Sequence, residues 1–151
     1  MAPAKKLYLP DEQATRALGE RLGTAARAGD VIALHGELGA GKTTLVHGLA
    51  AALAITGPVP SPTFVLVREY EGRLRLWHVD AYRLAGSDEA LAIGLDECLP
   101  GDGVTCVEWA ERIADLLPAT ALSVSLAADG EGRSAQVSAL DLARWLGEDE
   151  A

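Results

Sequence analysis

Apolar positions along this 151-residue chain follow two periods, one typical of strands and the other of helices. Short continuous apolar runs at residues 31–35 and 104–107 are typical of strands buried on both faces of a parallel sheet. Apolar residues three and four positions apart predict a helix that Asp11 caps and another from Lys42 to about Thr56. The alternation of the two patterns predicts an α/β fold.

The middle of the chain reads differently. Residues 63–70 and 73–79 favour strands, and Glu71-Gly72 between them predicts an inserted antiparallel hairpin. Weaker patterns predict strands at 7–9, 122–127 and 135–138 and helices at 87–95, 109–117 and 140–146. We therefore expect one three-layer domain over residues 1–151, with an ordered core from about 5 to 147 and a mostly parallel central sheet.

Composition limits the classes of protein to which this chain can belong. With 49% hydrophobic and 23% charged residues the chain has material for one folded core. No apolar stretch approaches the roughly 18 residues of a membrane span, so no membrane association is expected. The two cysteines, Cys98 and Cys106, lack metal-type spacing, and a reducing cytoplasm is the default location.

A complete phosphate-binding pattern follows the strand at 31–35, namely Gly36-Glu37-Leu38-Gly39-Ala40-Gly41-Lys42-Thr43. Its glycines permit backbone angles that let consecutive amides converge on phosphate oxygens, at the positive end of the next helix. Lys42 is expected to reach the outer phosphates, and the Thr43 hydroxyl to bind Mg²⁺. The predicted nucleotide contacts in this P-loop are Glu37, Leu38, Gly39, Ala40, Gly41, Lys42, Thr43 and Thr44.

Residue usage sharpens this prediction. Arginine outnumbers lysine ten to three, and Lys42 is the only lysine beyond Lys5 and Lys6. A compact ammonium has thus been kept where a forked guanidinium would not fit the same pocket. The chain contains no asparagine, so the Asn-Lys-x-Asp motif that reads guanine is absent. ATP, or weak base selectivity, is favoured.

Hydrolysis requires a carboxylate near the metal and a group that senses the third phosphate. Glu108 and Asp80 each end a predicted strand, and either could hold Mg²⁺ through water or orient the attacking water. Thr63, in Ser-Pro-Thr, occupies the position where GTPase-like proteins place a switch threonine. His78 is a candidate base or a structural residue, and Trp109 either walls the site or fills the core.

Several segments in order closely resemble the bacterial TsaE (YjeE) family of ATPases for tRNA threonylcarbamoyladenosine biosynthesis. The resemblance runs from about residue 7 to residue 133, nearly the whole chain. Its specific segments are Gly36-Glu37-Leu38-Gly39-Ala40-Gly41-Lys42-Thr43-Thr44, Ser61-Pro62-Thr63-Phe64, Leu66-Val67-Arg68-Glu69-Tyr70, His78-Val79-Asp80-Ala81-Tyr82-Arg83-Leu84 and Glu108-Trp109. Ala110 departs from the proline or serine that often follows Glu-Trp in the family.

The resemblance implies a subunit that binds ATP and Mg²⁺ and hydrolyses ATP slowly without partners. It implies action with TsaD-like and TsaB-like proteins in N6-threonylcarbamoylation (t6A) of tRNA next to the anticodon, the transfer chemistry belonging to the TsaD-like partner. By motif, Lys42 and Thr43 match the phosphate and Mg²⁺ contacts. Glu108 matches the metal-site acid, Asp80 an aspartate near the nucleotide, and Thr63 a switch-like threonine. Arg133 matches a late element close to the base.

The formal net charge of −9 disfavours direct tRNA binding by the isolated chain, so tRNA is expected to be reached through the complex. Arginines concentrate in the middle third, but interleaved Glu69 and Glu71 favour a solvated strand face over a basic patch. Two alternatives remain open. One is a small-molecule P-loop kinase, for which 151 residues leave little room for a lid. The other is an assembly module that ATP switches and that barely turns over.

Overall fold

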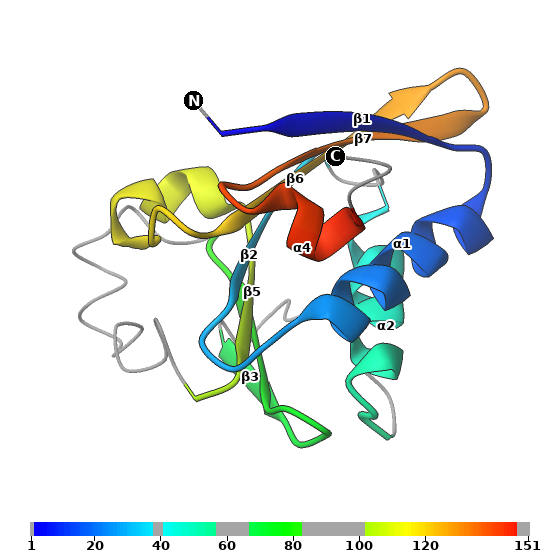
Figure 1. Cartoon of the computed structure of the whole chain (residues 1–151). Coiled ribbons are helices and arrows are strands. Elements are labelled where there is room, and N and C mark those ends of the chain that lie inside the picture. Colours follow the sequence, from blue (N-terminus) through cyan, green and yellow to red (C-terminus); the bar gives the residue numbers. More distant parts are fainter. Residues whose placement is uncertain (1, 38–40, 57–66, 83–101, 148–151) are drawn as a thin grey trace.

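The computed structural model describes residues 2–37, 41–56, 67–82 and 102–147, and in this part a seven-stranded sheet forms the centre (Figure 1). The strand order across the sheet is β1-β7-β6-β2-β5-β4-β3. The strands are β1 (Ala4–Leu9), β2 (Val31–His35), β3 (Val67–Tyr70), β4 (Leu76–Asp80), β5 (Val104–Glu108), β6 (Leu122–Asp129) and β7 (Gly132–Ser138).

The sheet is mixed, which corrects the expectation of a mostly parallel one. The four inner strands β6, β2, β5 and β4 are parallel neighbours. The pairs at the two edges, β1–β7, β7–β6 and β4–β3, are antiparallel. The predicted hairpin at the middle of the chain is therefore part of the main sheet, because β4 also pairs with β5. A continuous apolar run indicates parallel pairing only for strands that are covered on both faces of the sheet.

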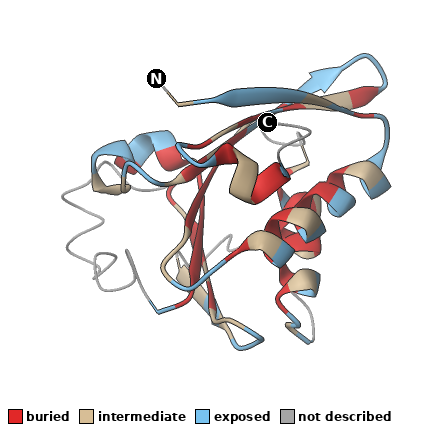
Figure 2. Ribbon diagram, in the orientation of Figure 1, coloured by how far each residue is buried: buried red, intermediate tan, exposed pale blue. Residues whose placement is uncertain are grey.

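Helices cover both faces of the sheet in the described part of the chain. On one face α1 (Glu12–Ala25), α2 (Lys42–Ala52) and α4 (Leu142–Leu146) pack on a large apolar cluster. On the other, the 3₁₀ segment η2 (Ala110–Leu116) packs on a smaller one. Buried residues line the inner strands and the inward sides of α1 and α2 (Figure 2). None of the helices described is long and apolar enough to cross a membrane.

The helix α1 begins as its sequence predicts. The Asp11 side chain accepts a hydrogen bond of 2.8 Å from the amide of Ala14, which satisfies an amide left unpaired at the helix start. Leu18 and Leu22 point into the core, as expected from their spacing. Gly19 and Gly23, which follow these two leucines in the sequence, are also buried. The predicted apolar face did not include them. These glycines determine how closely α2 approaches.

Helices α1 and α2 are in backbone contact through small residues. A methyl group added at Gly19 would lie 2.0 Å from the carbonyl oxygen of Leu45 in α2. A methyl group added at Gly48 would lie 2.0 Å from the carbonyl oxygen of Arg16 in α1. Separations this short require the helices to move apart. Since α2 begins at the phosphate loop, this contact also determines where the loop lies on the sheet.

Replacing Gly19 with alanine is expected to lower the free energy of unfolding by roughly 1–3 kcal/mol, because the added methyl group overpacks the helix contact. In an open helix the same change would stabilise the protein, by about 1 kcal/mol. The sign of the change is therefore diagnostic. Urea unfolding of Gly19→Ala measures the change in free energy. Gln13→Ala, at an exposed position of α1, is the control. An increase in stability for Gly19→Ala would contradict the close packing of α1 on α2.

Several boundaries differ from the sequence prediction. The helix expected over 109–117 is a 3₁₀ segment of residues 110–116, because Trp109 has a left-handed φ of 57° and Ile113 is non-helical. The second hairpin strand begins at Leu76 instead of residue 73, since the amide of Arg73 is bound to the carbonyl of Leu53. The last helix begins at residue 142, not 140. The helix expected over 87–95 lies outside the described residues.

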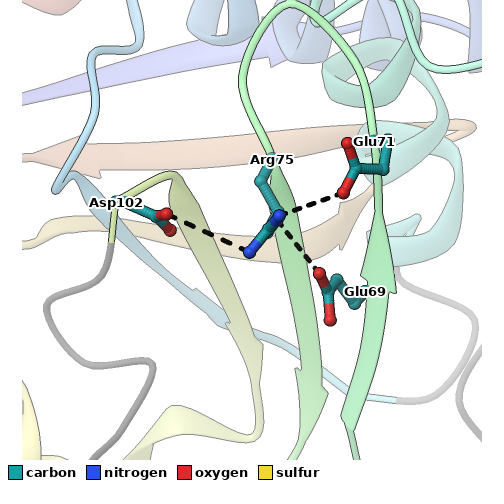
Figure 3. Close-up of polar contacts among 4 residues, drawn as sticks. All are labelled: Glu69, Glu71, Arg75 and Asp102. Atoms are coloured by element: carbon teal, nitrogen blue, oxygen red, sulfur yellow. Dashed lines mark hydrogen bonds and ion pairs between the residues drawn. The ribbon is translucent and has the colours of Figure 1, made fainter.

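The arginines of the middle third form no open basic patch in the described residues. The guanidinium of Arg75 is shared by Glu69 at 3.0 Å, Glu71 at 3.1 Å and Asp102 at 4.0 Å (Figure 3). These carboxylates, Glu69 first, hold the pKa of Arg75 above its usual value. Arg73 donates to the carbonyl of Gly23 at 2.7 Å. The expectation that Glu69 and Glu71 compensate the charge is confirmed for Arg75, whereas Arg73 binds a backbone carbonyl of α1.

Candidate functional site

Three neighbouring strands bring the predicted site residues to one edge of the sheet. Strand β5 lies between β2 and β4, and all three are parallel. Glu108, at the end of β5, is in register with Leu34 of β2 and with Asp80 of β4. Because the phosphate loop leaves the end of β2, the loop and both carboxylates meet at the carboxyl edge of the sheet. Ligands of open α/β sheets bind at this edge.

The two ends of the loop have the backbone conformations that its glycines permit. Gly36 has a φ of 143° and Gly41 a φ of 104°, and Gly41 directly precedes α2. The side chain of Lys42 is directed back to the start of the loop, where its Nζ donates a hydrogen bond of 2.7 Å to the carbonyl of Gly36. Thr43 is exposed and Thr44 half-buried in the first turn of α2. Residues 38–40, which include three predicted contacts, lie outside the described residues.

Trp109 contacts the predicted phosphate-binding lysine and also packs against the smaller apolar cluster. The Nζ of Lys42 lies 4.0 Å from the centroid of its indole ring, within the range of a cation–π contact. The ring of Tyr82 lies 4.9 Å away on a tilted plane. Lys42 is only 6% exposed, so the carbonyl of Gly36 and the indole of Trp109 hold its ammonium largely away from solvent. The left-handed backbone of Trp109 turns the chain sharply after Glu108, which directs the indole toward the loop.

The two candidate carboxylates have different surroundings. Glu108 is buried, and its Oε2 lies 2.6 Å from Nε2 of His78. The side chain of Asp80 is half-buried, and its Oδ1 accepts a hydrogen bond of 2.9 Å from the amide of Tyr82. Burial raises the pKa of the neighbouring Cys106 thiol well above its usual value, and the charge of Glu108 raises it further. Glu108 is the more buried of the two carboxylates.

A contact between side chains joins the end of β2 to η2. Nδ1 of His35, the last residue of β2, lies 2.8 Å from Oε2 of Glu111. Partial burial raises the pKa of Glu111, but hydrogen bonds from its own backbone and from His35, with the charges of His35 and Lys42, outweigh burial. The net effect is a pKa below the usual value. No sequence pattern predicts this pair, because nothing local relates positions 35 and 111.

A cavity of about 410 Å³ opens beside the start of α2. Its walls come from the end of β1, the start of α1, the start of α2 and the β6–β7 turn; among the lining residues are Leu9, Asp11, Thr15, Gly41, Thr44 and Arg133. Leu9 and Arg133 are in register across the antiparallel pair β1–β7, which explains their proximity. The volume suits the nucleoside part of a ligand. Arg133 and Thr44, both predicted contacts, line this cavity, whereas no sequence pattern pointed to the lining residues of β1 and α1.

The predicted site residues that the structure relates to one another fall in two regions that adjoin at the start of α2. The end of the loop, Lys42, Asp80 and Glu108 meet at one edge of the sheet, and Arg133 lies at the cavity beside α2. Thr63 lies outside the described residues.

The oxygen donors at this edge fit Mg²⁺. Among the described residues no group of three or more His, Cys, Asp or Glu side chains could hold a metal ion by itself. Mg²⁺ at nucleotide sites needs only one or two carboxylates, since phosphates and water supply the other ligands. The donors that the chain offers are the hydroxyl of Thr43 and the carboxylates of Glu108 and Asp80, all hard oxygen ligands.

Fold and site define an α/β protein with a strand–loop–helix unit and adjoining carboxylates at the carboxyl edge of a mixed sheet. Residues 9–136 match the model of the family described as "Threonylcarbamoyl adenosine biosynthesis protein TsaE". The chain belongs to the TsaE family.

Individual relatives agree with this assignment. The chain is 45% identical to the tRNA threonylcarbamoyladenosine biosynthesis protein TsaE of Nostoc sp., over 88% of this chain and 85% of the relative. It is 44% identical to the protein of the same name from Bacillus subtilis, over 81% and 75%. The crystal structure of YdiB from Bacillus subtilis superposes with a TM-score of 0.83 at 34% identity, covering 99% of this chain and 95% of that one.

Proposed function

We propose that this protein is the Mg²⁺-dependent ATP-binding and ATP-hydrolysing subunit of the t6A modification of tRNA, acting in the cytoplasm with TsaD-like and TsaB-like partners. The observation that carries the proposal is the arrangement of three side chains: Asp80 and Glu108 are in register at the ends of β4 and β5, and Lys42 contacts Gly36 after β2 and Trp109 after β5. Membership of the TsaE family, whose relatives are named for this biosynthesis, supports the pathway.

ATP binding is assigned to the loop and to the neighbouring cavity. The amides of residues 37–44 and the ammonium of Lys42 bind the phosphates, at the positive end of α2. The nucleoside part occupies the cavity of about 410 Å³, where Arg133 and Thr44 contact it. A cavity with acidic side chains at its wall supplies acceptors for the amino group of adenine, and the absence of asparagine removes the usual guanine-reading motif.

The carboxylates divide the remaining work. Glu108, buried and next to the loop strand, is the metal-site acid together with the Thr43 hydroxyl. Bound Mg²⁺ would neutralise charge that develops on the phosphate oxygens. Asp80, more accessible and fixed by the amide of Tyr82, orients the attacking water. Thr63 senses the third phosphate, and Trp109 walls off solvent beside Lys42.

The ATPase rate is expected to rise when TsaD-like and TsaB-like proteins and tRNA are added. A partner that contributes one charge-assisted hydrogen bond to the transition state would raise the rate about tenfold or more. The measurement is phosphate release by the chain alone and by the assembled mixture. The same mixture containing Lys42→Ala provides the control, because any ATPase activity of the partners themselves remains in it. Failure of the partners to change the rate would favour a P-loop kinase.

A further inference from the structure

His78 lies directly beneath the proposed metal-site acid. Side chains alternate between the two faces of a strand, so His78 and Asp80 are on the same face of β4. His78 is in register with Cys106, and its imidazole reaches diagonally to Glu108, two residues further along β5. The side chains of His78 and Glu108 are 1% and 6% exposed, and Nε2 and Oε2 are 2.6 Å apart. This pair is therefore buried beneath the surface of the proposed site.

The hydrogen-bonding pattern of His78 differs from that of a structural core histidine. Buried polar atoms are normally hydrogen-bonded, and a histidine retained for packing would pair both ring nitrogens. The buried Nδ1 of His78 has no hydrogen-bond partner among the described residues. The polar contact that the ring makes goes instead to Glu108. Within the described part of the chain, one nitrogen therefore lacks a partner while the other contacts the proposed metal-site acid.

The direction of this hydrogen bond follows from the partners. A carboxylate that serves a metal is ionised and only accepts hydrogen bonds, so in that role Nε2 carries a proton and donates a hydrogen bond to Oε2 of Glu108. Glu108 is the last residue of β5 and precedes the sharp turn at Trp109, so the strand does not restrain its carboxylate from both sides. The imidazole supplies that restraint from below. Oε1 would then remain available to the metal or to its bound water.

We propose that His78 is a positioning residue for the ATPase site: by donating from Nε2 to Oε2 it fixes the carboxylate of Glu108 in the orientation that serves Mg²⁺ bound with ATP. This inference rests on the proposed function, because it assigns Glu108 to the metal. The proposed role requires no contact between His78 and the nucleotide. It predicts that the position of one ring nitrogen, and not the volume or polarity of the side chain, decides the effect of a substitution at position 78.

Two amide variants separate the ring nitrogens. In His78→Gln the side-chain amide nitrogen takes about the place of Nε2, whereas in His78→Asn it takes about the place of Nδ1. We expect His78→Gln to retain the Mg²⁺-dependent affinity for a fluorescent ATP analogue, and His78→Asn and His78→Leu to lose about 10–100-fold of it, as partners of metal ligands do. Affinity for the same analogue in EDTA should be equal in all four proteins. Turnover should follow the Mg²⁺-dependent affinity.

Thermal unfolding and a double-mutant cycle separate positioning from general destabilisation. In a Glu108→Gln background, His78→Asn should cause little further loss of Mg²⁺-dependent affinity, because the carboxylate it positions is already gone. A loss of equal size in both backgrounds would overturn the proposal. So would equal Mg²⁺ dependence of wild type, His78→Gln and His78→Asn.

The outcome for the wild type tests the proposed function separately. If the unaltered protein binds the ATP analogue equally well with Mg²⁺ and with EDTA, the metal assignment fails, and the role of His78 fails with it. If Mg²⁺ strengthens binding in the wild type but the variants at position 78 show no difference, only the positioning role fails. The two failures are therefore distinguishable in one titration series.

Discussion

ATP affinity is expected to fall by at least about 100-fold when Lys42 is replaced by alanine, because several charge-assisted hydrogen bonds to phosphate disappear together. The ammonium is already held near the loop by the carbonyl of Gly36 and the indole of Trp109. Little ordering of the side chain is then required when phosphate binds. Removal of the cation leaves the loop amides but no compact positive charge beside them.

Two further variants make the test of Lys42 specific. Lys6→Ala removes the same type of side chain from an exposed position of β1 and should leave affinity unchanged. Lys42→Arg keeps the charge but introduces a planar fork, which is too large for a pocket shaped around an ammonium, and most affinity should again be lost. Titration with a fluorescent ATP analogue measures the affinity of all variants, and ATP should raise the melting temperature of the wild type and of Lys6→Ala but not of the two Lys42 variants. Unchanged affinity in Lys42→Ala would refute the assignment of the loop.

Turnover is expected to fall about 10²–10³-fold in Glu108→Ala, since several kcal/mol of metal-dependent charge stabilisation are lost. The same change removes the partner of a buried imidazole nitrogen, which should lower the free energy of unfolding by roughly 1–3 kcal/mol. Asp80→Ala should also reduce turnover, with a smaller effect on stability because Asp80 is less buried. Full ATPase activity in both variants would refute the metal-site argument.

Isosteric amides separate charge from structure at these two positions. Asp80→Asn keeps an oxygen that can accept from the amide of Tyr82 but removes the negative charge, so turnover should fall while the local turn is kept. Glu108→Gln likewise keeps an acceptor for His78. Glu20→Gln on the exposed side of α1 is the matched control and should behave as the wild type. Single-turnover ATP hydrolysis measures the effect of losing the charge, and melting curves measure any effect on the structure.

Elements whose cause is local were predictable. The strand Val31–His35 has the predicted bounds, because a run of consecutive apolar residues contains its own signal. The cap at Asp11 was predictable for the same reason: its partner, the amide of Ala14, is three residues away. The hairpin boundary at residue 73 was wrong because Arg73 is bound to Leu53 and Gly23, contacts that no local pattern encodes.

The proposed site divides along the same line. Lys42 and Glu108 could be selected because the loop pattern and the strand ends are written in consecutive residues. The nucleoside cavity could not, since it depends on the pairing of Leu9 with Arg133, which are distant in the chain. Nor could the contact of His78 with Glu108, which requires β4 and β5 to be neighbours in one register.

The sequence by itself determined the alternation of strands and helices, the phosphate loop and the candidate carboxylates, because these depend on the period of apolar residues and on short motifs. The tertiary structure alone decided the mixed order of the sheet, the glycine contact between α1 and α2, and the partners of Lys42, Glu108 and Arg133. These features arise from pairings between distant segments. Such pairings follow from the burial of the whole chain and leave no periodic signal in any one segment.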